Sequence, residues 1–327
     1  MVTLKDIANK AGVSTGTVSR ILSNDHNLKV SPDTRKKVLC IAEEMHYVGR
    51  KVKSENTLGK VLSITSHRKK IEISDLFNHS LVWGVETSLS NAGYQIDQIT
   101  FEEKSIDYSE YNGILAIGDF DEAALLSLKS ADIPIVFLNS NTLGSDLSCV
   151  TIDFKNAVNR IMHYLLNEGH KYIGLIAANS SFYQSKNILD PRITHYIDIA
   201  KEKDIYDTKF IFHGDFSIQS GYQAMTEAIE NLGEELPSAF FCISDAMAIG
   251  ALRALKDHNI SSPKDVRIIG FGNIEIGEYM TPKLSTIDPH PGQMGRSGSF
   301  VLQNMIKGLQ LYPVNVVTST DLIIRES

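Results

Sequence analysis

The 327-residue sequence predicts an α/β protein with an N-terminal three-helix, helix-turn-helix head and a two-lobed body, each lobe a doubly wound parallel sheet. Two observations predict the body. Beyond residue 60, short apolar runs alternate with longer amphipathic stretches, and this region is about twice as long as one doubly wound unit. A third observation, three short helical patterns in residues 1–47, predicts the head.

The head is expected to contain three helices with recognisable starts and stops. Thr3 and Asp6 have the spacing of a capping box, and Gly12 is suited to end the first helix. Ser14 is expected to cap the second helix and Ser31 the third. Apolar residues in the third helix recur at i, i+3, i+4 and i+7 and form one stripe that can cover the other two helices: Val38, Ile41, Ala42 and Met45.

The body is expected to consist of short buried strands separated by helices. Continuous apolar runs bounded by turn signals are typical of strands covered on both faces of a parallel sheet. Amphipathic stretches at 156–167, 221–232 and 246–257 predict covering helices. The expected strands are 61–65, 113–118, 135–138, 150–152, 172–177, 210–212, 240–243 and 266–271.

Residues 48–60 separate the head from the body. This stretch is polar, basic and without apolar periodicity, as expected of a linker. Residues 1–60 contain 11 Lys and Arg and 6 Asp and Glu, a balance of +5, and since the whole chain carries −7, the remainder carries −12. A basic head on an acidic body favours a head that binds polyanionic phosphate, although a solvated charge run has the same composition.

Residues 3–22 carry the strongest motif. A helix, a tight turn around Gly12 and a Ser-capped second helix have the spacing of a helix-turn-helix, in which the second helix enters the major groove, although an ordinary helical hairpin has a similar pattern. Arg20 is suited to a guanine edge or a phosphate, and hydroxyl groups are suited to phosphate oxygens. The residues expected to contact DNA are Thr3, Leu4, Ser14, Thr15, Gly16, Thr17, Ser19, Arg20, Ser31 and Thr34.

Five segments resemble the lactose/galactose repressor family of bacterial transcriptional regulators. DIANKAGVSTGTVSR at 6–20 and VSPDTRKKV at 30–38 resemble the head of that family. FCISDAMAIGALRAL at 241–255, DVRIIGFGN at 265–273 and PKLSTI at 282–287 extend the resemblance through nearly the whole chain. The sequence is most similar to repressors of galactose and β-galactoside operons.

The resemblance implies a sequence-specific DNA-binding repressor of a sugar-utilisation operon, with DNA affinity controlled by a small carbohydrate of the galactose or β-galactoside type. It implies a periplasmic-binding-protein-like body whose lobes are joined by three crossovers and hold the sugar between them. It also implies a homodimer on a palindromic operator. The expected parts are a head at 1–47, a hinge at 48–60 and an effector-binding and dimerisation domain at 61–327, with an N-lobe of 61–155 and 289–318 and a C-lobe of 156–288 and 319–327.

Carried over residue by residue, the family's sugar site implies eight positions in this chain. Arg192 matches a cationic side chain that donates hydrogen bonds to sugar hydroxyls, and Phe216 matches an aromatic ring against the apolar face of the sugar. A surface Arg in the first turn of a helix, a core Phe, and a helix cap for Asp245 are the structural alternatives. The eight are Asp75 and Phe77 in an expected loop, then Asn139, Arg192, Phe216, Ser244, Asp245 and Asn273.

Three positions depart from the family's pattern. An acidic residue usually follows Gly-Phe, but here Gly272 and then Asn273 follow, so either Asn273 substitutes for the acid or the ligand is unusual. The recognition helix has Gly16 where relatives carry a base-reading side chain. The linker has Gly49 and Asn56 in place of the family's Pro and wedge Leu, so we expect no minor-groove wedge and less DNA bending than in relatives.

Other classes of protein lack support in the sequence. The nucleotide-binding and nucleophile motifs G-x-G-x-x-G, G-x-x-x-x-G-K-[ST] and G-x-S-x-G are missing, and no His has metal-ligand spacing, so we expect no catalysis, cofactor or metal. Cys40, Cys149 and Cys242 are expected to be reduced. Without a signal-peptide pattern or a membrane-length apolar run, a cytoplasmic protein with no membrane contact is expected. The alternatives are the same regulator with a non-sugar effector and a transport-type sugar-binding protein.

Overall fold

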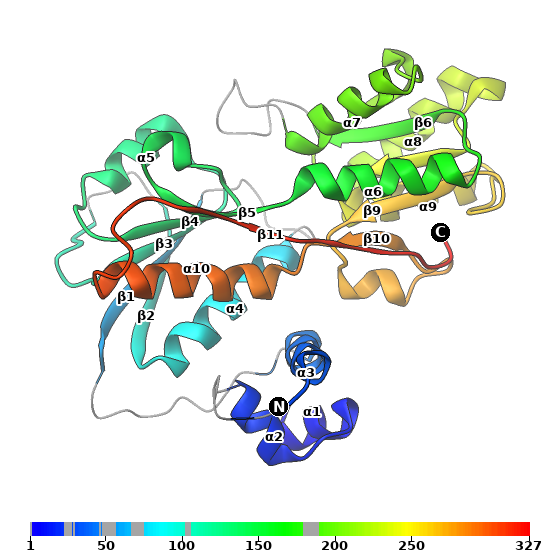
Figure 1. Cartoon of the computed structure of the whole chain (residues 1–327). Coiled ribbons are helices and arrows are strands. Elements are labelled where there is room, and N and C mark those ends of the chain that lie inside the picture. Colours follow the sequence, from blue (N-terminus) through cyan, green and yellow to red (C-terminus); the bar gives the residue numbers. More distant parts are fainter. Residues whose placement is uncertain are drawn as a thin grey trace.

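The computed structural model describes residues 2–22, 28, 30–45, 47, 57–66, 75–101, 106–178 and 190–327. Within these residues the chain forms a three-helix head and a body of two α/β lobes that lie side by side (Figure 1). The predicted fold class is confirmed. Gly49 and Asn56, on which the hinge prediction depends, lie outside the described residues.

The predicted capping interactions define the ends of the head helices. The Thr3 hydroxyl accepts the backbone N–H of Asp6 at 3.3 Å, and the Asp6 carboxylate accepts the Thr3 N–H at 2.8 Å. The Ser14 and Ser31 hydroxyls each accept the N–H three residues later, at 3.1 Å. Gly12 ends the first helix with a left-handed φ of 73°. The helices are α1 (Leu4–Ala11), α2 (Thr15–Leu22) and α3 (Pro32–Glu44).

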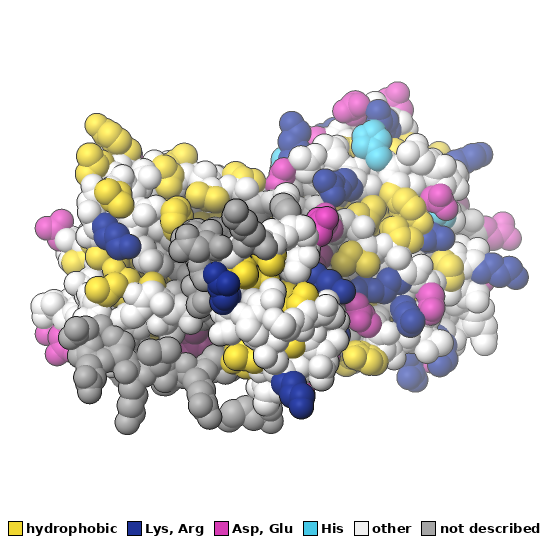
Figure 2. Space-filling model, turned by 60° about the horizontal axis from the view of Figure 1, so that its bottom comes forward, with side chains coloured by type: hydrophobic (Ala, Val, Ile, Leu, Met, Phe, Trp, Pro, Cys, Tyr) yellow, Lys and Arg dark blue, Asp and Glu magenta, His cyan; other side chains and the backbone are white. Residues whose placement is uncertain are grey.

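The apolar stripe of α3 covers the other two helices, as predicted. Val38, Ile41 and Ala42 are buried against side chains of α1 and α2, and Met45 is partly buried beside them. This small core leaves the polar face of α2 exposed. The head lies beneath the body in Figure 1 and comes to the front in Figure 2, where Lys and Arg side chains mark its surface.

The N-lobe is a six-stranded parallel sheet in the order β11-β5-β4-β3-β1-β2, with helices on both faces. Its central strands are buried on both faces, as their continuous apolar sequences predict. Its elements are β1 (Gly59–Thr65), α4 (Asp75–Asn91), β2 (Tyr94–Thr100), β3 (Gly113–Ile117), α5 (Glu122–Lys129), β4 (Ile135–Leu138), β5 (Ser148–Ile152), α10 (Pro291–Ile306) and β11 (Asn315–Thr318).

The C-lobe repeats this architecture in the order β12-β10-β9-β8-β6-β7. Its strands are parallel except β12, which pairs antiparallel with β10 at the edge. Its elements are α6 (Phe154–Asn167), β6 (Ile173–Ala178), α7 (Pro191–Glu202), β7 (Ile211–Gly214), α8 (Ile218–Leu232), β8 (Ala239–Cys242), α9 (Asp245–Asp257), β9 (Arg267–Phe271), β10 (Ser285–Asp288) and β12 (Asp321–Ile323).

The chain passes from one lobe to the other at three described places: between β5 and α6, between β10 and α10, and between β11 and β12. The eight expected strands all form, with ends shifted by a few residues. Strands β2, β10, β11 and β12 were not predicted. They are short or partly exposed and lack a continuous apolar run, so periodicity alone does not distinguish them from loops.

Two sequence expectations concern residues outside the site. Cys149 and Cys242 are buried and Cys40 is partly buried, and all three are free thiols. None of the described helices combines the length and apolar character needed to span a membrane.

Candidate functional site

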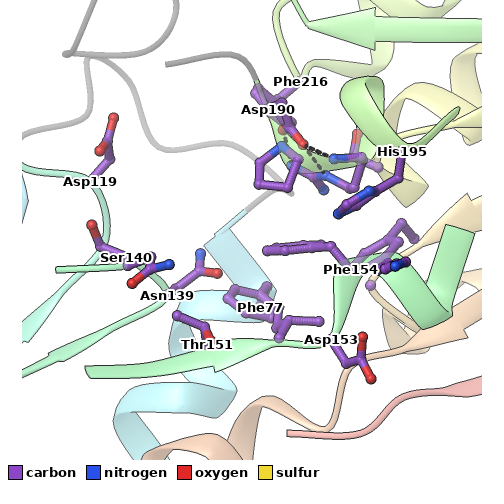
Figure 3. A pocket seen from close by; sticks show the side chains of 18 of the residues that line it. Phe77, Asp119, Asn139, Ser140, Thr151, Asp153, Phe154, Asp190, His195 and Phe216 are labelled. Carbon is purple, nitrogen blue, oxygen red and sulfur yellow. Dashed lines mark hydrogen bonds and ion pairs between the residues drawn. The ribbon is translucent and has the colours of Figure 1, made fainter. Parts of the chain in front are cut away.

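A cavity of about 570 Å³ lies between the two lobes, at the carboxyl ends of their strands. In open α/β sheets this edge is where loops present side chains to ligands, and the volume falls within the roughly 300 to 1,000 Å³ of small-molecule sites. Figure 3 shows Asp119, Asn139 and Ser140 on one side of the cavity and Asp190 and His195 on the other. Both lobes therefore contribute to its wall.

Arg192 is the centre of the C-lobe wall. Its Nε and Nη2 donate to the two carboxylate oxygens of Asp190 at 2.9 and 2.6 Å, a bidentate pair, and its Nη1 donates to the Ile243 carbonyl at 2.6 Å. Asp190 is 2% exposed and also caps α7 by accepting the Arg192 backbone N–H. With Pro191 at the first helical position, this local sequence fixes both the start of α7 and the orientation of the guanidinium.

Three phenylalanine rings surround the same guanidinium. The Arg192 Cζ lies 5.5 Å from the ring centroid of Phe154, 5.6 Å from that of Phe216 and 5.1 Å from that of Phe271. These distances are within the range of cation–π attraction. Phe77, from the N-terminal end of α4, lines the same cavity (Figure 3). The cavity therefore has an aromatic part suited to the apolar face of a ring-shaped ligand.

Beside Phe77, the N-lobe wall presents several polar groups. Asp119 and Ser140 lie just beyond β3 and β4, and Thr151 lies on β5. Asn139, the first residue after β4, has a left-handed φ of 64°, which Asn tolerates better than most residues. These short side chains offer amide, hydroxyl and carboxylate groups to a ligand that carries several hydroxyls.

Ser244 and Asp245 both line the cavity but have different roles in the fold. Ser244 lines the cavity and caps α9, because its hydroxyl accepts the N–H of Met247 at 3.2 Å. The idea that Asp245 caps this helix is therefore wrong. Its carboxylate is 2% exposed and accepts the Thr286 hydroxyl at 2.5 Å and the Ile274 N–H at 2.9 Å. Burial raises the pKa of Asp245 to about 6.

Asn273 does not line the cavity. Its side-chain N–H donates to Asp288 at 3.2 Å and its oxygen accepts from Arg325 at 2.8 Å, so it ties the loop after β9 to the neighbouring strands. Gly272 lines the cavity instead and has a φ of +136°. A Cβ built there would lie 3.5 Å from an Asp245 carboxylate oxygen. The proposed substitution of Asn273 for the family's acid thus lacks the geometry it needs.

The remaining site residues divide into those the sequence pointed to and those it missed. Phe77 lies on α4 rather than in a loop, and Asp75 is the first residue of that helix, with a side chain outside the described part of the structure. Most of the missed residues lie at strand ends or helix starts, and this position is a sequence signal that could have found Asp119 and Asp190. The missed residues are Asp119, Ser140, Thr151, Asp153, Phe154, Asp190, His195 and Phe271.

The predicted DNA-binding residues lie on α2 and at the starts of α1 and α3. Thr15, Gly16, Ser19 and Arg20 form the exposed face of α2. The hydroxyls of Ser14 and Thr17 lie 2.9 Å apart at its start, and those of Ser31 and Thr34 lie 2.8 Å apart at the start of α3. Thr3 is exposed and Leu4 partly buried at the start of α1. Among the described residues, no group of His, Cys, Asp and Glu is arranged to hold a metal ion.

Comparison with known proteins identifies the family. The pattern described as "Bacterial regulatory proteins, lacI family" matches residues 3–49, and a "Periplasmic binding protein-like domain" matches residues 162–327. The chain is 34% identical over its whole length to the HTH-type transcriptional regulator GalR of Streptococcus thermophilus, of which the match covers 99%. The chain belongs to the lacI family of bacterial regulatory proteins.

Other transcriptional regulators match equally widely. The HTH-type transcriptional repressor MelR of Bacillus subtilis (strain 168) is 32% identical, with 100% of this chain and 97% of the relative covered. A solved transcriptional regulator CelR–cellobiose complex aligns with all of this chain and all of its own, at 27% identity and a TM-score of 0.71. This lacI-family chain is therefore a helix-turn-helix transcriptional regulator, in a family of regulators rather than enzymes.

Proposed function

We propose that this regulator represses a sugar-utilisation operon and that its operator affinity is controlled by a neutral carbohydrate, of the galactose or β-galactoside type, bound between the lobes. The observation that carries the proposal is the Arg192 cluster with its three phenylalanine rings. An aromatic surface packs against the apolar face of a sugar ring, and fixed polar groups around it bind the hydroxyls.

The two walls of the cavity support a ligand that contacts both lobes. The aromatic groups lie mainly on the C-lobe side and the short polar groups on the N-lobe side, and the volume of about 570 Å³ suits a ligand longer than one sugar ring. A similar solved protein is a complex with the disaccharide cellobiose, and a similar relative is named GalR. We therefore favour a disaccharide over a monosaccharide.

Calorimetric titration of the full chain tests the effector. Galactose, lactose, allolactose and cellobiose should be compared, and at least one galactoside should bind with an affinity that Arg192→Ala lowers about a hundredfold. Phe210→Leu is a suitable control, because this buried C-lobe Phe does not line the cavity. Binding of a phosphorylated metabolite or a purine in place of every sugar would leave the regulator assignment intact and overturn the effector proposal.

We infer further that two chains bind a palindromic operator through the exposed face of α2. One small head buries little surface, and helix-turn-helix proteins pair two heads on two half-sites. Sedimentation should give twice the 36.2 kDa chain mass. Operator affinity should fall steeply with salt, and Arg20→Ala should weaken it by roughly 1 to 3 kcal/mol if that side chain reads a base. A stable monomer with full operator affinity would contradict the inference.

A further inference from the structure

The core of the head includes a side chain from the body. Trp83, on α4 of the N-lobe, is 7% exposed and belongs to the same buried cluster as Ile7, Val18 and Val38 of the head. Its indole N–H donates to the Tyr47 carbonyl, just beyond α3, at 2.8 Å. A buried indole with its one donor satisfied is typical of a specific contact between two surfaces.

A second contact lies at the end of the recognition helix. The Asn91 side-chain N–H, at the C-terminal end of α4, donates to the Leu22 carbonyl at 2.8 Å. Leu22 is the last residue of α2, where helix carbonyls lack intrahelical partners. Asn91 therefore caps the recognition helix from another domain. Two contacts eight residues apart along one helix fix the direction of the head as well as its position.

The docked head keeps its DNA-reading face uncovered. Thr15, Gly16, Ser19 and Arg20 are all exposed while Trp83 is buried. The two hydrogen bonds from α4 go to the carbonyls of Tyr47, beyond α3, and of Leu22, at the end of α2, and neither involves an exposed side chain of α2. The docked arrangement is therefore compatible with DNA binding by α2.

Helix α4 is a rigid support for these contacts. It packs along α10, and a Cβ built on Gly84 would lie 2.2 Å from the Gly292 carbonyl, so the two backbones approach very closely. The Arg296 guanidinium of α10 lies 6.0 Å from the Trp83 ring centroid, on a ring that also contacts the head. Phe77, at the other end of α4, lines the cavity. The rise along the helix axis from Phe77 to Asn91 is about 21 Å.

We propose that the Trp83–Asn91 side of helix α4 is the docking surface for the chain's own head and holds the recognition helix in its DNA-binding orientation while operator is bound. A head held in the bound orientation loses less orientational freedom on binding, which strengthens binding without any new DNA contact. The docking orients α2 relative to the N-lobe without relying on a hinge helix between them. This inference rests on the proposed operator binding by the head.

The single tryptophan of the chain makes the proposal directly measurable. Acrylamide quenching of Trp83 should be weak in the free full-length chain. It should stay weak when the chain binds a duplex that it has selected from a random-sequence pool. A severalfold rise in quenching on binding would mean that the head leaves α4 to reach DNA, and would overturn the proposal. If no duplex is bound, the proposed operator function fails instead.

Variants test whether docking contributes to affinity. Asn91→Ala removes one hydrogen bond from an exposed position and should weaken binding to the same duplex by about two- to tenfold. Trp83→Phe should weaken it by a similar factor, since it keeps the ring packing and loses the indole N–H. Ser90→Ala, at an exposed neighbouring position on α4, is the control and should change nothing. Affinity that is unchanged or higher in Asn91→Ala and Trp83→Phe would overturn the proposal.

Discussion

The two walls of the cavity differ in how far their side chains are fixed by the protein itself. On the C-lobe wall, the Arg192 guanidinium is held by Asp190, by the Ile243 carbonyl and by three aromatic rings. On the N-lobe wall, Asn139 and Ser140 are short side chains at strand ends. The comparison indicates that the C-lobe wall is a preorganised platform, whereas the N-lobe wall presents short polar side chains to the cavity.

A rigid platform and a polar wall are suited to different parts of recognition. Preorganised aromatic and cationic groups lose little freedom when a ligand arrives, so we expect them to supply most of the affinity. Individual polar groups distinguish ligands by the placement of their hydroxyls, because an unmatched buried polar group is costly. Since the walls belong to different lobes, a ligand that contacts both stabilises one lobe arrangement over others.

Arg192→Ala should have the largest effect, on both stability and ligand binding. It leaves the buried Asp190 carboxylate without its cation, which costs about 3 to 5 kcal/mol of unfolding free energy, and we expect ligand affinity to fall about a hundredfold. Denaturant unfolding and calorimetry measure the two quantities. Arg192→Lys should retain part of the stability and lose the bidentate geometry. Wild-type stability of Arg192→Ala would contradict the conclusion that the Arg192–Asp190 ion pair stabilises the C-lobe.

Gly272→Asp should be the next most damaging change, although it restores the acidic residue usual in the family. An aspartate at φ +136° is strained by about 1 to 3 kcal/mol, and its carboxylate would lie next to the buried Asp245. We therefore expect lower stability and no gain in sugar affinity. Thermal unfolding and calorimetry check this, and tighter sugar binding would show that the C-lobe wall adapts more than its contacts indicate.

Phe216→Leu should weaken ligand binding by about tenfold, because a branched aliphatic side chain fills part of the volume but offers no ring face to a sugar. The matched change Phe210→Leu, in a buried C-lobe ring outside the cavity, should lower stability without changing affinity. Equal losses of affinity in the two variants would show that the effect comes from general loosening of the lobe.

Asn139 allows the polar wall to be tested separately from backbone strain. Asn139→Gly and Asn139→Ala both remove the amide, so both should weaken ligand binding by about two- to tenfold. Because φ is 64°, only the Ala variant should also lose stability, by about 1 to 2 kcal/mol. Calorimetry with denaturant unfolding separates the two effects. A hundredfold loss of affinity in Asn139→Gly would place the dominant contact on the N-lobe wall and reverse the comparison.

His290, next to the crossover between β10 and α10, should give the smallest effect. Its hydrogen bond with Asp288, together with the carboxylate of Asp321, raises its pKa above 6.5. Arg160 also lies 3.9 Å from Asp321. The histidine's contribution to stability is therefore complete below pH 6.5 and is lost as the pH rises through the raised pKa. The difference in unfolding free energy between wild type and His290→Gln should therefore fall as the pH rises above 6.5. A difference that grows with pH would contradict the raised pKa of His290.

Local interactions explain why the sequence predicted the head so well. The capping residues Thr3, Ser14 and Ser31 act on N–H groups within three positions, and the α3 stripe follows from helical periodicity. The buried strands were equally readable, because each is a continuous apolar run. The partly exposed strands β11 and β12 were missed, since their pairing depends on partners far away in the chain.

The candidate site was predictable only in part. The position of Arg192 and Phe216 at the cavity agrees with what the family resemblance implied, but Phe154 and Phe271 became visible only through their contacts with Arg192. Asn273 has a side chain and a sequence position suited to contact a ligand, yet its amide is hydrogen-bonded to Asp288 and Arg325. No spacing rule reveals which of two neighbouring loop residues faces a cavity.

The sequence by itself determined the ends of the head helices, the continuous apolar strands and the family, because these depend on short motifs, near neighbours and periodicity. Only the tertiary structure decided which side chains meet across long separations. The Arg192 cluster joins residues from α6, α7, the loop before α8 and β9, and Trp83 completes the core of a head that ends more than thirty residues before it. Such contacts form because removing apolar surface from water is favourable for any two surfaces that the fold brings together. The sequence around one residue does not indicate which distant residue it will contact.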